Sequence, residues 1–168
     1  MFRFPRQSGV TLIELMITIV VLAVLLAAGM PSFAEWTTNM RIRTVGESML
    51  NGLKTARMEA VKQNTLVYFN IDSLPSPHWH VRRVSDNADL AQSEFGETPV
   101  EVQVGGDTAR RVIFNGLGLV SESSGSTIDL SVPESVLPAS KTRNLRILVS
   151  GGLLKLCDPN VSGDPRAC

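Results

Sequence analysis

The sequence predicts an α+β protein in which one long N-terminal helix packs on an antiparallel β-sheet. Apolar residues fill positions 10–30 and then recur at helical spacing as far as residue 64. From residue 65 onward, short apolar and polar alternations are separated by Gly, Pro, Asn and Ser, which is typical of strands joined by turns. A run of strands that follows a helix favours the α+β class.

A short basic leader comes before the apolar run. It contains Arg3 and Arg6 and ends at Gly9. The apolar run, residues 10–30, carries one charge, Glu14. A helix that rises ~1.5 Å per residue would span ~31 Å over this run, about the hydrocarbon thickness of a bilayer. The sequence therefore predicts one transmembrane helix here.

Membrane insertion alone does not explain Glu14, because a carboxylate within such a helix costs about 2.5–3.5 kcal/mol. One interpretation is an ordinary cleavable signal peptide, which would make this a secreted soluble protein. Small residues at 27–29 or 32–34 would then form the cleavage site. Against it, the run is longer than the ~7–15 apolar residues of a signal peptide, and a signal peptide has no use for an acid there.

The segment Ser8-Gly9-Val10-Thr11-Leu12-Ile13-Glu14-Leu15, with Pro31 further on, resembles the type IV prepilin signature. The resemblance implies that a prepilin peptidase cuts after Gly9, that the new amine of Val10 is methylated, and that the apolar helix stays attached. Val10 stands where the family usually has Phe. Since a buried charge is tolerated when it is paired, Glu14 is expected to pair with the amine of a neighbouring subunit in a filament.

The two leader arginines precede the apolar run, which predicts a cytoplasmic N-terminus and a head outside the cytoplasm. The prepilin resemblance then implies a single-pass protein of the bacterial inner membrane, with its head in the periplasm, that later enters a pilus or pseudopilus. Its implied partners are the prepilin peptidase, an inner-membrane assembly platform and other pilins or pseudopilins.

An amphipathic helix, residues 31–64, is expected to continue the membrane helix, with Pro31 kinking or loosening it. Arg41 and Arg43 are interpreted as a solvated helix face or as contacts to lipid headgroups. Residues 50–61 resemble the helix end of the FimT/GspH family through their Leu…Ala-Arg-x-Glu-Ala pattern. The apolar stripe expected to pack on the sheet consists of Phe33, Met40, Val45, Met49, Leu53, Ala56, Ala60 and Val61.

The remaining chain, residues 65–168, is predicted to form a β-rich head. Gly151-Gly152 is expected to turn a hairpin, and Gly105-Gly106-Asp107 another turn. Surface loops are predicted at 73–77, 121–126 and 133–142. The predicted strands are residues 65–71, 78–84, 99–104, 110–115, 127–132, 145–149 and 153–156.

Both cysteines, Cys157 and Cys168, lie at the end of the chain. Outside the cytoplasm they are expected to form a disulfide, and closing such a loop contributes about 3 kcal/mol in the chain-entropy model. Metal binding is the other interpretation of two cysteines. It is disfavoured because no histidine is near them in sequence and the spacing is not CxxC.

Three further motifs contain residue types that could support chemistry. His78-Trp79-His80 has the two imidazoles of a zinc site but no third ligand, so an exposed strand face is preferred. Gly116-Leu117-Gly118 lacks the spacing of a phosphate loop and is interpreted as a turn. Residues 121–124 have no histidine partner nearby in sequence. The sequence thus predicts no enzyme, no cofactor and no metal site.

The turn Phe114-Asn115-Gly116-Leu117-Gly118 and the tail from Cys157-Asp158-Pro159 to Arg166-Ala167-Cys168 add to the resemblance to the FimT/GspH family. The resemblance implies a type IV pilin-like fold, with Pro31 shaping the helix. It also implies the function of a minor pilin or pseudopilin, a low-copy subunit of a type IV pilus or of a type II secretion pseudopilus.

A DNA receptor is the alternative function, because some FimT-type proteins bind DNA through a C-terminal Gly-Arg-x-Arg motif. Here the matching residues are Gly152-Leu153-Leu154-Lys155, without either arginine. The chain has 16 basic and 16 acidic residues, and loss of the leader arginines leaves 14 against 16, a net charge of −2. Such a chain has no bulk positive field for nucleic acid. The candidate DNA contacts that remain are Arg143, Arg146, Lys155 and Arg166.

Overall fold

The computed structural model describes residues 9–93, 102–105 and 109–168. The chain divides into two compact units, Met1–Trp36 and Thr37–Cys168, and each is described by itself. Helix α1 (Leu12–Gln63) contributes to both units and continues without a break through Pro31. In the first unit its apolar side chains are exposed over the whole predicted membrane segment.

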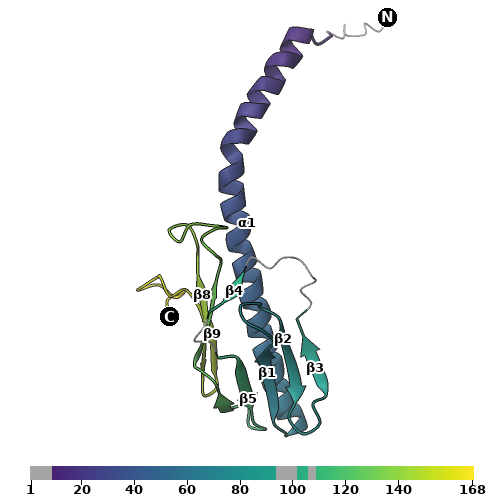
Figure 1. Ribbon diagram of the computed structural model, residues 1–168, viewed down its shortest axis with the longest axis vertical. Coiled ribbons are helices and arrows are strands. Elements are labelled where there is room, and N and C mark those ends of the chain that lie inside the picture. The colour runs from purple at the N-terminus through teal and green to yellow at the C-terminus, as the bar shows by residue number, and fades with distance from the viewer. Residues whose placement is uncertain (1–8, 94–101, 106–108) are drawn as a thin grey trace, which may run out of the picture. The chain divides into compact units, whose positions relative to one another are not determined.

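The second unit contains the end of α1 and the strands that follow it (Figure 1). All their pairings are antiparallel, as predicted, and they build two sheets with the orders β3-β2-β1-β5-β6 and β4-β7-β8-β9. The strands are β1 (Val67–Ile71), β2 (Trp79–Arg83), β3 (Asp89–Gln92), β4 (Gln103–Val104), β5 (Arg111–Phe114), β6 (Val120–Ser123), β7 (Thr127–Ser131), β8 (Leu145–Ser150) and β9 (Leu153–Cys157).

Helix α1 ends where the sequence pattern changes. Asn64 has a φ of 47°, the left-handed conformation that terminates helices, and Asn tolerates it better than most residues. The amide of Asn64 donates to the carbonyl oxygen of Val61 at 3.2 Å, and that of Thr65 to Ala60 at 3.1 Å. This pair of bonds is a Schellman motif, which satisfies two carbonyls of the last turn and starts the chain toward β1.

One face of α1 packs on both sheets. Its buried residues are Thr38, Ile42, Val45, Gly46, Met49, Gly52, Leu53, Ala56 and Ala60. Gly46 and Gly52 have no side chain and so permit the close approach of α1 to the two sheets. A Cβ built on Gly46 would lie 3.1 Å from Leu130 in one sheet, and one built on Gly52 would lie 2.9 Å from the ring of Trp79 in the other. Substituting Gly52 would therefore force either the ring of Trp79 or the helix to shift.

Several sequence predictions for this helix face need correction. Val45, Met49, Leu53, Ala56 and Ala60 are buried as predicted. Ile42 and the two glycines were missed. Conversely, the predicted stripe residues Met40, Val61 and Phe33 are exposed. At about 100° per residue, Met40 lies on the side of the helix opposite Ile42, Met49 and Leu53, which explains its exposure.

The predicted strands at 65–71, 78–84, 110–115, 127–132, 145–149 and 153–156 correspond to β1, β2, β5, β7, β8 and β9. Two strands were missed, β3 and β6, and the predicted loop at 121–126 is wrong where β6 occupies it. Of the strand predicted at 99–104, only the end is described, as β4; residues 99–101 and the turn at 106–107 lie outside the described residues. Gly151 and Gly152 form the predicted turn between β8 and β9.

Candidate functional site

The start of α1 is the first candidate site. Thr11 precedes the helix, and its Oγ1 accepts a hydrogen bond from the backbone N–H of Glu14 at 3.3 Å. A Thr at the N-cap with a Glu three residues later is the capping-box pattern, which satisfies free N–H groups at a helix N-terminus. An acidic side chain in the first turn also interacts favourably with the helix dipole. Thr11 was not identified from the sequence, although this spacing is visible there.

The side chain of Glu14 is exposed and has no ion-pair or hydrogen-bond partner among the described residues. The side chains that follow it are apolar as far as Met30, apart from the hydroxyl of Thr18, which donates to the carbonyl of Leu15 at 2.8 Å. Within the part of the chain that the structure describes, one helix, α1, is long and apolar enough to cross a membrane. The carboxylate of Glu14 is thus available for a partner outside this chain.

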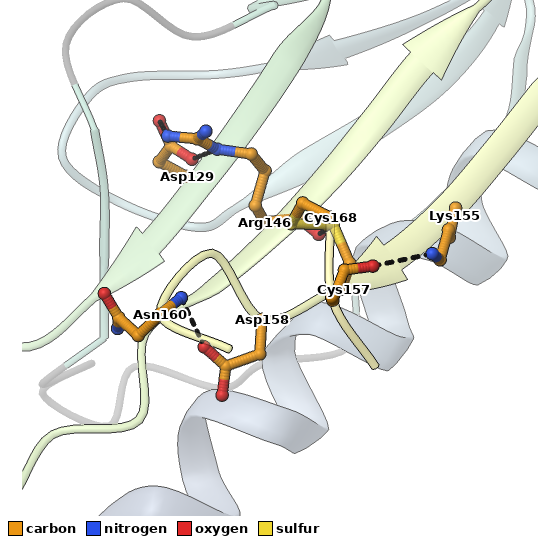
Figure 2. The surroundings of a disulfide bond; sticks show 8 residues. Asp129, Arg146, Lys155, Cys157, Asp158, Asn160 and Cys168 are labelled. Carbon is orange, nitrogen blue, oxygen red and sulfur yellow. Dashed lines mark hydrogen bonds and ion pairs between the residues drawn. A yellow bond between two sulfur atoms is a disulfide. The ribbon is translucent and has the colours of Figure 1, made fainter. Parts of the chain in front are cut away.

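The C-terminal loop is the second candidate site. Cys157 and Cys168 form the predicted disulfide, which excludes metal binding by their thiolates (Figure 2). Cys157 ends β9 and is buried, and its sulfur lies 3.4 Å from the carbonyl oxygen of Arg146 in β8. The side chain of Lys155 donates to the carbonyl oxygen of Ala167 at 2.7 Å. These contacts fasten the chain end to the edge strand β9.

Two Asp-Pro turns shape this loop. The carboxylate of Asp158 accepts the backbone N–H of Asn160 at 2.9 Å, and that of Asp164 accepts the N–H of Arg166 at 2.8 Å. The backbone N–H of Asp158 donates to the carbonyl of Arg166 at 2.7 Å, which brings the two ends of the loop together. The loop is held by its own backbone as well as by the disulfide.

The four candidate DNA contacts do not form a patch of free cations. Arg146 makes a two-pronged ion pair with Asp129 on β7, at 2.5 and 3.1 Å, and this carboxylate raises the pKa of Arg146 (Figure 2). Arg166 makes a similar pair with Asp164 at 3.0 Å, which raises the pKa of Arg166 and lowers that of Asp164 to about 2. Lys155 is held by Ala167, as described above.

Arg143 is exposed, and its backbone N–H donates to the side chain of Asn39 on α1 at 2.8 Å. Asn39 also donates to the carbonyl of Lys141 at 3.0 Å. Asn39 therefore fixes the backbone of the loop after Pro133. Among the described residues, no ion pair or hydrogen bond holds the guanidinium of Arg143. A phosphate would have to compete with a carboxylate for Arg146 and for Arg166.

Arg57 is a residue whose role the sequence did not reveal. It projects from α1, and its Nη1 donates to the carbonyl of Gly152 at 2.9 Å, in the turn between β8 and β9. Gly118, in the turn after β5, has a φ of 73°, and a Cβ there would lie 3.1 Å from Nε of Arg57. Arg57 thus links the helix to the turn between β8 and β9 and lies close to the turn after β5, both distant in sequence.

His78 and His80, the two imidazoles of the possible zinc motif, are half-buried rather than on an exposed strand face. His78 lies 3.4 Å from the hydroxyl of Ser93, and the ring of His80 contacts the carboxylate of Asp72. Among the described residues, no group of three His, Cys, Asp or Glu side chains is arranged to hold a metal ion. Gly116 and Leu117 lie in a turn, as predicted.

Two family models match the chain. The model described as type II transport protein GspH matches residues 46–152, more than half of the chain. The model of the prokaryotic N-terminal methylation motif matches residues 4–30, which include the segment from Ser8 to Leu15. No curated protein matches the chain.

Solved structures give a similar picture. The minor pilin FimU of Pseudomonas aeruginosa strain PAO1 matches in two crystal forms. The first crystal form has 14% identity and a TM-score of 0.55, and the match covers 79% of this chain and 98% of FimU. The second has 13% identity and a TM-score of 0.53, and the match covers 75% of this chain and 98% of FimU. The minor pseudopilin EpsH of the Vibrio cholerae type 2 secretion system matches at 15% identity and a TM-score of 0.48, over 72% and 99%. At this identity, the likeness to FimU concerns the fold, a long N-terminal helix with antiparallel sheets.

Proposed function

Because this chain belongs to the GspH family of type II transport proteins, we propose that it is a low-copy structural subunit, a minor pilin or pseudopilin, that enters a helical filament through the N-terminal part of α1. The observation that carries the proposal is an apolar helix with exposed side chains and one unpaired carboxylate, Glu14, five positions after Gly9. The filament is a type IV pilus or a type II secretion pseudopilus.

The proposed route begins in the inner membrane. Arg3 and Arg6 keep the leader in the cytoplasm, where a prepilin peptidase removes it after Gly9 and Val10 is methylated. The head, closed by its disulfide, folds in the periplasm, an oxidising compartment. An inner-membrane assembly platform then transfers the subunit into the filament, where Pro31 shapes the helix. No catalytic step by this chain is part of the proposal.

Glu14 has the central part in assembly. After cleavage, Val10 presents a new amine just before the helix cap at Thr11. A positive charge there is unfavourable next to the positive end of the helix dipole, and an acid in the first turn offsets it. In a stack of such helices, the carboxylate of one subunit pairs with the amine of the next. The pair then fixes the register of the apolar helices, as one polar residue does in a coiled coil.

The mature N-terminus tests this proposal. The intact mass of protein extracted from membranes is expected to correspond to a chain that starts at N-methylated Val10, because the resemblance of residues 8–15 to the prepilin signature implies a cut after Gly9. Protein from cells without the prepilin peptidase serves as the control and is expected to retain the leader. A mature chain that starts at Glu35 would indicate an ordinary signal peptide and would refute filament assembly through α1.

DNA binding separates the proposed role from that of a DNA receptor. We expect the full chain in detergent to bind a short duplex no more tightly than the ~10⁻⁴–10⁻⁶ M of non-specific contacts, because Arg146 and Arg166 are already paired with carboxylates. Leu153, which is 56% exposed at the start of β9, occupies the place of an arginine in the DNA-binding motif. Leu153→Arg combined with Lys155→Arg is expected to strengthen binding and steepen its salt dependence.

Fluorescence anisotropy of a labelled duplex at two salt concentrations measures both effects. Leu153→Ala is the matched control, since it removes the same side chain without adding charge, and it is expected to bind like the unmodified chain. Tight binding by the unmodified chain that is weakened by Arg143→Ala or Arg146→Ala would instead support a DNA receptor.

A further inference from the structure

The aromatic residues of this chain fall into two groups. In the second unit, Tyr68, Phe69, Trp79 and Phe114 are buried. In the first unit, Phe33 and Trp36 are 67% and 60% exposed, and their ring centroids lie 6.0 Å apart on one side of α1. Among the described residues, these are the two Phe, Tyr or Trp side chains that the fold leaves at the surface.

The exposed pair lies just beyond the apolar run. Phe33 is three residues and Trp36 six residues after Met30, which places them ~4–5 Å and ~9 Å further along the helix. Each headgroup layer of a bilayer adds roughly 5–8 Å to a hydrocarbon core of about 30 Å. With the apolar run spanning the core, the Cα of Phe33 therefore falls within the headgroup layer and the Cα of Trp36 at its outer edge.

The direction of the side chains strengthens this placement. Helical side chains point back toward the N-terminus of their helix, here toward the membrane segment. Phe33 supplies an apolar ring, and Trp36 adds an indole N–H that can donate to ester or phosphate oxygens. Trp in particular is enriched at membrane–water interfaces, because one part of its ring is apolar and its N–H can remain hydrated.

We propose that Phe33 and Trp36 form an interfacial pair that binds the headgroup layer of the phospholipid bilayer on the head side and sets the depth of α1 before assembly. The inference rests on the membrane-inserted state of the proposed function. It assigns contact with the lipid headgroups to two aromatic residues outside the Gly9–Glu14 signature.

The two tryptophans provide an internal comparison. The full chain is reconstituted into vesicles of phosphatidylethanolamine and phosphatidylglycerol, with bromine placed either high on the acyl chains, near the headgroups, or near the chain ends. Trp36→Phe leaves the buried Trp79 as the only tryptophan. The difference between the unmodified chain and this variant gives the emission of Trp36 without any change in the core. Flotation of the vesicles reports insertion independently.

The emission of Trp36 is expected to fall at least about twofold with bromine near the headgroups and clearly less with bromine near the chain ends. Trp79 is expected to be unaffected in both. If the chain floats with the vesicles and Trp36 is not quenched, the interfacial anchor is refuted while membrane insertion stands. Stronger quenching by the deep bromines would also refute it. If the chain does not float, both the anchor and the proposed membrane-inserted state are wrong.

Discussion

Glu14→Ala is expected to lower the amount of this protein in sheared filaments at least about tenfold, while its amount in the membrane stays unchanged or increases. Removing one member of a buried charge pair leaves the other charge unpaired, which costs about 3–5 kcal/mol and corresponds to a loss of more than tenfold in an equilibrium. In the membrane, by contrast, loss of an unpaired carboxylate favours insertion. Quantitative immunoblotting of sheared and membrane fractions measures both amounts.

A second variant separates the charge of Glu14 from its position at the helix start. Gln is as suitable as Glu at the third position of a capping box, but it carries no charge. We therefore expect Glu14→Gln to be excluded from filaments as strongly as Glu14→Ala. If Glu14→Gln assembles like the unmodified chain, the charge pair is not required and the pairing role is wrong.

Thr11→Val is the matched control. It removes the Oγ1 that accepts the N–H of Glu14 and keeps the size of the side chain. Loss of an N-cap costs about 0.5–2 kcal/mol of helix stability. That cost acts on the first turn of a long helix, so this variant is expected to assemble much better than either Glu14 variant. Equal loss in all three variants would place the defect in the helix start rather than in the charge.

Much of the fold could be predicted because the patterns that encode it are local. Alternating burial is visible in β5 and β7, whose inward residues are Val, Phe, Ile and Leu. β3 and β6 lack it. Their sequences, Asp-Leu-Ala-Gln and Val-Ser-Glu-Ser, are half-exposed edge strands of the first sheet, paired on one side. Backbone hydrogen bonds, which the side-chain pattern does not reveal, hold such strands in place.

The packing face of α1 shows a second limit. Gly46 and Gly52 are buried against Leu130 and Trp79, but glycine carries no hydrophobic signal and usually disfavours a helix. Their role follows from the close approach of two sheets to one helix, which is a tertiary property. The division of the strands between two sheets could not be predicted for the same reason, since it depends on which strands pair.

The candidate sites also divide into features that are visible in the sequence and features that depend on the fold. The signature around Gly9 and the cysteine pair are sequence patterns, and the disulfide prediction is confirmed. The state of the C-terminal cations could not be predicted. Arg146 faces Asp129 because β7 and β8 pair in that register, although the two residues are far apart in the chain. Only the fold shows that the guanidinium of Arg146 is already paired with the carboxylate of Asp129.

Cys157→Ser is expected to lower the free energy of unfolding of the second unit by about 3 kcal/mol, and its melting temperature by roughly 10 °C. The bond closes a loop with a sequence separation of 11 residues and limits the freedom of the unfolded chain. Thermal unfolding of the full chain in detergent, followed by circular dichroism, measures the shift.

The variant Cys157→Ser with Cys168→Ser removes the remaining free thiol and is expected to show the same shift. Ser162→Ala, an exposed change in the same loop, is the matched control and is expected to leave the melting temperature unchanged. The hydrogen bonds from Lys155 to Ala167 and from Asp158 to Arg166 remain in all these variants, so the rest of the head is expected to keep its fold. If the melting temperature of the double serine variant equals that of the unmodified chain, these backbone contacts hold the loop without the disulfide. If both thiols of the denatured, unreduced protein react with an alkylating agent, the bond does not form in the periplasm, because a closed disulfide leaves no thiolate to react.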